Sequence, residues 1–261
     1  MKAVKISDTV LQEQDLPGAK TFFRNFIGQA GVLQDSPQAY LVNIPQRDDY
    51  VLPHFHDVDQ FQFVVEGSGR CGKQPWSPGA FYYSDAYASY GPIVAGEDGL
   101  SFLTLRVASA SGQFEMPGSR HLMPGKPGRG ATGHLEFHAV PGAGEASEQE
   151  VILSRPDGVE VVSQHLGPNA SAVGIIPSAG GGAYYVICAG SLIQDGNSLP
   201  KTSVMFVGAD EEAPLLQAGP DGAVIAILQF SKPNARHGSD PRQLAGRASV
   251  RYVVAGETKP T

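Results

Sequence analysis

The amino-acid sequence predicts an all-β protein composed of two similar units. Turn-forming residues are abundant, because the 261 residues include 32 glycines and 20 prolines. The apolar runs between them are short, which favours many strands over long helices. A strand–glycine pattern also recurs at equal spacing in the two halves of the chain, which indicates an internal repeat. The length allows one large or two small domains with a sizeable core.

The repeat consists of a strand-sized apolar run that ends in a glycine and, 32 residues later, a second glycine that opens another apolar strand. This spacing is identical in both halves and predicts two β-units of about a hundred residues each, as in two-barrel proteins. The two copies are the run 61–66 with Gly67 and Gly99, and the run 184–189 with Gly190 and Gly222.

A segment rich in glycine and proline separates the two copies and is the natural inter-domain connection. The predicted division is an N-terminal barrel over 1–110, a connection over 111–148 and a C-terminal barrel over 149–261. The connection contains three histidines that we interpret as surface or structural residues rather than functional ones. They are His121, His134 and His138.

Charge and cysteine content exclude several classes of function. The formal net charge is −7, the isoelectric point is about 5.5, and there is no run of Lys or Arg. Nucleic acid and acidic membranes are therefore not expected partners. No secretion signal and no apolar run of membrane-spanning length is found. The only cysteines are Cys71 and Cys188, which exclude a disulfide framework, so we expect a cytoplasmic protein.

The most informative segment lies directly before the first copy of the repeat. His54 and His56 are separated by one residue, so on a strand their side chains point to the same face. Gln60 follows four residues after His56 and begins the apolar run. This arrangement resembles the first motif of the cupin superfamily, in which two His and a carboxylate hold a metal inside a small β-barrel. Gln60 stands at the position of that carboxylate.

The resemblance extends to a second motif. Pro78 and Gly79 form a turn that precedes a strand, and Tyr90 stands where the family usually has a third His. The resemblance implies a bicupin, with two double-stranded β-helix (jelly-roll) barrels and a transition metal such as Fe, Zn, Ni or Mn in the first. Tyr is a good ligand only as phenolate, which requires a strongly Lewis-acidic ion. The implied ligands are His54, His56, Gln60 and Tyr90.

Strand parity predicts which side chains of the first unit face the barrel interior. Two glutamines inside a barrel carry a desolvation cost unless they meet water, a ligand or each other. Asp57 and Asp59, in the turn before Gln60, are interpreted as outward-pointing turn residues. The predicted interior set is Gln60, Gln62 and Val64, and the predicted outward set is Phe61, Phe63 and Val65.

The same positions in the second unit are apolar. Its predicted interior set is Ala183, Tyr185 and Ile187. The residues that correspond to the two histidines and to Gln60 are Pro177, Ala179 and Ala183, none of which binds a metal. The simplest interpretation is a wet, functional cavity in the first barrel and a packed, structural second barrel.

The resemblance implies a metal-dependent enzyme that acts on a small oxygenated or aromatic metabolite. In one mechanism the ion is a Lewis acid and Tyr90 moves a proton, as in an isomerase, lyase or decarboxylase. In the other, an open metal position supports dioxygenase chemistry. Gln60 and Tyr90 argue against this second mechanism, because they replace the carboxylate and the third His of the family pattern. Gln62 and Tyr83 are the candidate substrate-binding residues.

A non-catalytic binding module is the alternative from a different class. Gln60, Gln62 and Tyr90 are neutral hydrogen-bonding groups that suit a sugar or another hydroxylated ligand. The presence of a metal distinguishes the two hypotheses, because a binding module can function without one. In either case we expect a small-molecule ligand or substrate, and possible pairing as a homodimer follows from the common pairing of cupins through sheet faces.

Overall fold

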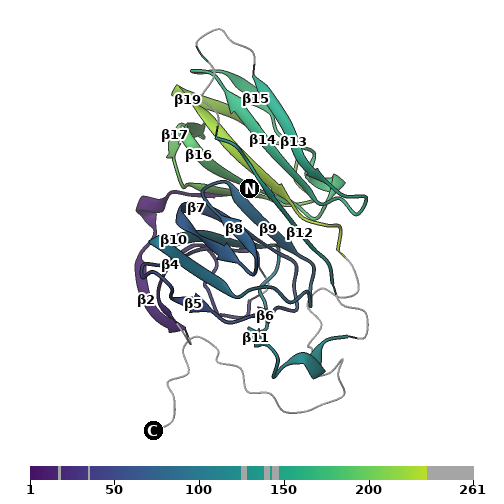
Figure 1. Cartoon of the computed structure of the whole chain (residues 1–261). Helices are drawn as coiled ribbons and strands as arrows, with labels where there is room; N and C mark the ends of the chain where they lie inside the picture. The colour runs from purple at the N-terminus through teal and green to yellow at the C-terminus, as the bar shows by residue number, and fades with distance from the viewer. Residues whose placement is uncertain (17–18, 35, 125–127, 138–141, 143–146, 234–261) are drawn as a thin grey trace. The chain divides into compact units, whose positions relative to one another are not determined.

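The computed structural model is all-β, as predicted, with three short 3-10 helices among the residues it describes. Two compact units are present (Figure 1): the N-terminal unit, residues 11–132, and the C-terminal unit, residues 1–10 and 133–233. In this described part, no helix is long and apolar enough to cross a membrane. The described residues are 1–16, 19–34, 36–124, 128–137, 142 and 147–233.

A nine-stranded antiparallel sheet forms most of the described N-terminal unit. Its strands are β2 (Leu11–Leu16), β3 (Ala19–Ile27), β4 (Gln38–Ile44), β5 (Tyr50–Val51), β7 (Gln60–Cys71), β8 (Gln74–Trp76), β9 (Ala80–Ser84), β10 (Ile93–Arg106) and β12 (Gly130–His134). The main order is β12-β9-β7-β10-β4-β3-β2. A separate ribbon pairs β6 (His54–Phe55) with β11 (Phe114–Glu115), and the 3-10 helix η2 (Arg120–Leu122) follows.

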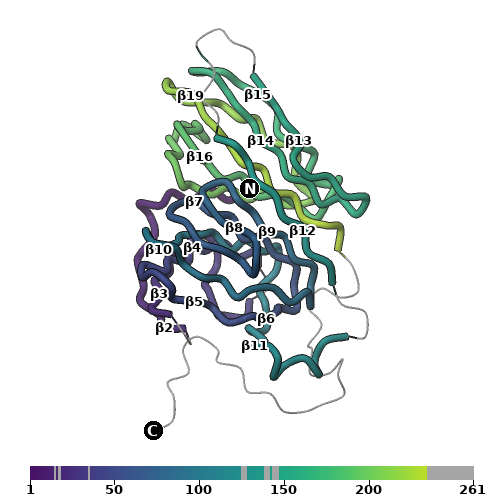
Figure 2. The backbone as a smooth tube through the Cα atoms, in the orientation of Figure 1, coloured from purple at the N-terminus to yellow at the C-terminus, as the bar shows by residue number. Residues whose placement is uncertain are grey.

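An eight-stranded sheet forms the described C-terminal unit. Its strands are β1 (Lys2–Val4), β13 (Glu148–Ser154), β14 (Glu160–Leu166), β15 (Ser171–Val173), β16 (Ala183–Gln194), β17 (Asn197–Pro200), β18 (Val204–Val207) and β19 (Leu215–Gln229). The 3-10 helices η1 (Ile6–Asp8) and η3 (Pro177–Ala179) lie between strands. The long strands β16 and β19 run side by side (Figure 2).

The repeated glycines have the same structural role in both units. Gly67 in β7 and Gly190 in β16 have φ angles of +75° and +64°, which favour glycine. A Cβ on Gly67 would lie 2.3 Å from the carbonyl oxygen of Gly99, and a Cβ on Gly190 would lie 2.0 Å from that of Gly222. The strands were expected to end at these glycines, but they continue beyond them, because each glycine is paired within the sheet, next to β-bulges, and does not form a turn.

The unit boundaries differ from the predicted division at two places. Residues 2–4 belong to the C-terminal unit, because β1 pairs with β18 and forms the edge of that sheet. Residues 111–132, expected in the connection, belong to the N-terminal unit, because β11 pairs with β6 and the amide of Met116 donates to the carbonyl of Pro53 at 2.7 Å. Local sequence patterns do not show such distant backbone pairing. The part of the predicted C-terminal barrel after residue 233 lies outside the described residues.

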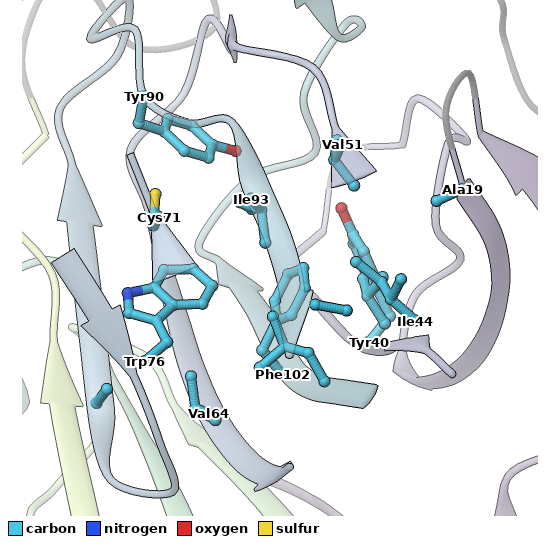
Figure 3. Packing of buried hydrophobic residues seen from close by; sticks show 14 of the residues in the cluster. Ala19, Tyr40, Ile44, Val51, Val64, Cys71, Trp76, Tyr90, Ile93 and Phe102 are labelled. Atoms are coloured by element: carbon cyan, nitrogen blue, oxygen red, sulfur yellow. The ribbon is translucent and has the colours of Figure 1, made fainter. Parts of the chain in front are cut away.

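The interiors of the two units follow the predicted strand parity. In the N-terminal unit, Val64 packs with Trp76 and Phe102 in an apolar cluster, and Tyr90 lies at one end of it (Figure 3). Phe61 and Phe63 face away from this cluster but are fully buried, and the ring of Phe61 packs against those of Phe81 and Tyr83. In the C-terminal unit, the core contains Ala183, Tyr185 and Ile187, as predicted.

Candidate functional site

Backbone pairing places His54 beside Tyr90. The two residues form an isolated antiparallel bridge, in which the amide of each donates to the carbonyl of the other at 3.1 and 3.0 Å. The next histidine is fixed by Tyr87, whose amide donates to the carbonyl of His56 at 2.7 Å and whose φ angle of +65° is unusual for a residue other than glycine. The rings of His54 and His56 are 5.1 Å apart, edge to face.

Both imidazoles are oriented by backbone carbonyls. Nδ1 of His54 lies 2.6 Å from the oxygen of Leu52, and Nδ1 of His56 lies 2.6 Å from that of Gly112. Since a carbonyl only accepts, the hydrogen of each neutral ring is on Nδ1 and the lone pair is on Nε2. Burial lowers the pKa of His54 to about 4, although its bond to Leu52 acts in the opposite direction. Burial also lowers the pKa of His56 well below its usual value.

The hydroxyl of Tyr90 connects three of the predicted site residues. Its oxygen lies 2.7 Å from Nε2 of His54, 2.5 Å from Nε2 of Gln60 and 2.8 Å from Nε2 of Gln62. Because the imidazole presents a lone pair, the phenol donates its single hydrogen to His54 and accepts from both amides. Burial raises the pKa of Tyr90 well above its usual value, so this residue is a neutral phenol here.

Arg106 is a site residue that the sequence interpretation missed. It is only 4% exposed, and its Nε donates to Oε1 of Gln60 at 3.0 Å. Its Nη1 donates to Oε1 of Gln38 at 3.2 Å, and the guanidinium lies over the ring of Tyr40. The positive charge contributes to the lowered pKa of both histidines. Thr104 pairs with Gln62, so Arg106 continues the same face of β10 toward Gln60, and this pairing between distant strands gives no local signal in the sequence.

Two acceptor atoms at this site have no hydrogen-bond partner among the described residues. Oε1 of Gln62 is buried and has no partner in the described part of the chain. No side chain or backbone group within the described residues bonds to Nε2 of His56. The amide of Gln60 differs, because Arg106 and Tyr90 occupy both of its ends.

Other predicted residues lie elsewhere. Tyr83 pairs with Phe61 across β7 and β9, so it shares the face of Phe61, and its hydroxyl donates to Asp59. Tyr82 takes the expected place of Tyr83, because it pairs with Gln62 and its ring lies 5.5 Å from that of Tyr90. The structure therefore does not bring Tyr83 together with the other site residues. Strand alternation explains the difference: neighbouring residues face opposite sides.

The two aspartates before Gln60 are buried, contrary to the expected outward orientation. Oδ1 of Asp57 accepts from the amide of Ser111 at 2.9 Å, and Oδ1 of Asp59 accepts from the amide of Ala86 at 2.7 Å. Each carboxylate thus organises a neighbouring loop, a role that the turn signal does not reveal. The histidines of the predicted connection agree with the surface interpretation where they are described: His121 and His134 are exposed, and His138 lies outside the described residues.

The donors at this site do not fit a resident divalent metal. Among the described residues, no group of three or more His, Cys, Asp or Glu side chains is arranged to hold an ion. The lone pair of His54 accepts the proton of Tyr90, and the oxygen of Gln60 accepts from Arg106. The set itself has no negative charge, and a buried guanidinium adjoins it, so a cation entering it would be repelled by Arg106.

No family model and no curated protein matches the sequence. Solved structures match over most of the chain. A bacterial pirin from Escherichia coli in complex with nickel(II) is 13% identical, with a TM-score of 0.56, and covers 88% of this chain and 99% of its own. An oxalate decarboxylase–formate complex from Lactobacillus farciminis is 12% identical, with a TM-score of 0.60, and covers 90% and 87%.

A putative dioxygenase from Nostoc punctiforme is also similar, with 12% identity, a TM-score of 0.59, and coverage of 90% of this chain and 85% of its own. All three proteins belong to the cupin superfamily. At this identity the similarity concerns the fold, and it agrees with the two β-units and the shared bulges described above. The chain therefore has the two-barrel fold of the bicupins.

Proposed function

We propose that the N-terminal unit binds a small polar molecule at its buried polar cluster and does so without a resident metal. The observation that supports this proposal is the contrast between the two units of one chain. The cluster comprises Gln38, His54, His56, Gln60, Gln62, Tyr90 and Arg106, all of them buried. At the corresponding positions of β16, the C-terminal unit buries Ala183, Tyr185 and Ile187 in an apolar core.

A buried polar cluster is not the only way to fill the interior of such a unit. Burying an amide or hydroxyl costs free energy wherever one of its hydrogen bonds is not made. Replacing buried charged or polar groups by well-packed apolar ones is often neutral or stabilising. The C-terminal unit is an example of such an apolar interior on the same scaffold. A polar interior in which the buried Oε1 of Gln62 has no partner among the described residues is consistent with ligand binding.

Metal-dependent catalysis on a small oxygenated or aromatic metabolite stays a prediction from the family resemblance. It gains support from the enzymes among the structural neighbours and from the nickel(II) in the pirin complex. The donor chemistry of the site weighs against it. Proton transfer from Tyr90 to His54 is also unfavourable, because the ordinary pKa values of phenol and imidazole differ by about 3.5 units, or about 5 kcal/mol, and burial moves both further apart.

Ligand screening combined with elemental analysis tests this proposal. Small polar metabolites are screened by thermal shift against the parent protein and the His56→Leu and His121→Leu variants, and hits are measured by calorimetry. We expect hits that bind the parent and the His121→Leu control but lose at least tenfold in affinity with His56→Leu. Equal binding to His56→Leu, or the absence of hits, would refute the proposal. Stoichiometric metal that is lost in the His54→Ala/His56→Ala variant would support the metal-dependent enzyme instead.

A further inference from the structure

We infer that the polar cluster selects an uncharged, hydroxylated ligand, and that Tyr90 is the positioning residue that imposes this choice by orienting the amide of Gln62. This inference rests on the proposed function, since it specifies the ligand class of the same site. It follows from the direction of each hydrogen bond in a chain that begins at the carbonyl of Leu52.

The first step fixes the direction of the Tyr90 hydroxyl. The carbonyl of Leu52 accepts from Nδ1 of His54, so Nε2 of this ring has only a lone pair. The phenol lies 2.7 Å from Nε2 and must donate to it. With its only hydrogen used, the oxygen of Tyr90 can do nothing but accept from its other two neighbours.

The second step fixes both amides. Gln60 and Gln62 each present their NH₂ group to Tyr90, at 2.5 and 2.8 Å. The orientation of Gln60 has independent support, because a guanidinium only donates and Nε of Arg106 lies 3.0 Å from Oε1 of Gln60. For Gln62, the opposite end of the amide is its carbonyl oxygen, which is buried without a partner among the described residues.

The third step gives the chemistry of the ligand. Oε1 of Gln62 is an acceptor, and so is Nε2 of His56, because Nδ1 of that ring carries the hydrogen that Gly112 accepts. Both atoms can accept a hydrogen bond from the ligand, and the buried Oε1 of Gln62 needs one; a hydroxyl provides it and an ionised carboxylate does not. A cationic ligand is disfavoured by the buried charge of Arg106, and Nε and Nη1 of this guanidinium already donate to Gln60 and Gln38 rather than to a ligand. An uncharged molecule with hydroxyl groups satisfies these conditions.

Matched sugar pairs test the inference. Binding of D-glucose and xylitol is compared with that of D-glucuronate and D-xylonate by NMR titration of the parent protein, with the side-chain signals of Gln62 and His56 as readout. We expect the neutral member of each pair to bind at least tenfold more tightly and to shift both signals. Equal or tighter binding of the acids, or no shift of these signals at 100 mM of any neutral probe, would overturn the inference.

The role of Tyr90 has its own readout. In Tyr90→Phe the amide of Gln62 is free to rotate, so the preference for the neutral member of a pair should fall to less than threefold. Tyr83→Phe is the matched control: it also loses a buried hydroxyl, but one that bonds to Asp59, and it should keep the preference. An unchanged preference in Tyr90→Phe would refute the positioning role. Tight binding of an anion found in the metabolite screen would refute the ligand class while leaving the proposed function intact.

Discussion

Replacing Tyr90 by Phe removes a single oxygen atom but alters three buried hydrogen bonds. That oxygen donates to His54 and accepts from Gln60 and Gln62. The ring itself stays in the apolar cluster with Val64 and Trp76, so packing changes little. The substitution therefore isolates the contribution of the hydroxyl to the stability of the N-terminal unit.

The expected loss of stability follows from these contacts. A buried hydrogen bond contributes on the order of 1 kcal/mol net, and a buried polar group that loses its partner costs on the order of 1–3 kcal/mol. With three partners affected and two amides able to rotate, we expect the free energy of unfolding to fall by about 3 kcal/mol. Tyr50→Phe is the control, because Tyr50 is 41% exposed, and it should change stability by less than about 0.5 kcal/mol.

Urea unfolding followed by tryptophan fluorescence measures this loss. Trp76 is the only tryptophan of the chain and lies in the same apolar cluster as Tyr90, so its emission reports on this unit. A loss below about 1 kcal/mol would contradict the assigned hydrogen-bond network. The parent should also keep its unfolding midpoint after dialysis against EDTA. A midpoint that falls as far as in Tyr90→Phe would show that a metal, and not the hydroxyl network, organises the site.

Three further predictions concern pH, backbone and charge. The pKa of His54 in the folded protein is about 4, below the ordinary 6.5, so the ring lowers the free energy of unfolding only when the unfolded chain is protonated. The free energy of unfolding should therefore be unaffected by this group above pH 6.5 and should fall by about 3 kcal/mol toward pH 4. Urea unfolding of the parent and of His54→Gln measures the difference, and an identical pH profile of the two proteins would contradict this. Gly67→Ala and Gly190→Ala should each cost at least about 2 kcal/mol, because the new Cβ meets a carbonyl oxygen at a positive φ; denaturation midpoints within error of the parent would disprove it. Arg106→Met should lower the free energy of unfolding by about 2 kcal/mol, because it leaves the buried oxygen of Gln60 without its donor. The loss of the positive charge should also raise the pKa of His54 in an NMR titration, and an unchanged pKa would exclude this charge effect.

Much of the fold follows from patterns of a few neighbouring residues. The spacing of Gly67 from Gly99 predicts a repeat that the structure shows as two equivalent bulges, because a positive φ is a local requirement that glycine meets. Period-two alternation correctly assigns Gln60 and Gln62 to one face of β7 and an apolar set to the same face of β16. His54 and Tyr90 were expected at the same site, and backbone pairing brings them together.

The remaining features depend on pairing between distant strands. Arg106 enters the site because β10 lies beside β7, and the choice of Tyr82 over Tyr83 depends on the register of β9. The first strand joins the C-terminal unit through β18, a contact separated by about two hundred residues in the chain. The direction of each amide depends on hydrogen bonds that converge on the Tyr90 hydroxyl. These features cannot be deduced from neighbouring residues. Residue type specifies which groups can donate or accept a hydrogen bond, whereas strand register and side-chain distance decide which of these groups meet.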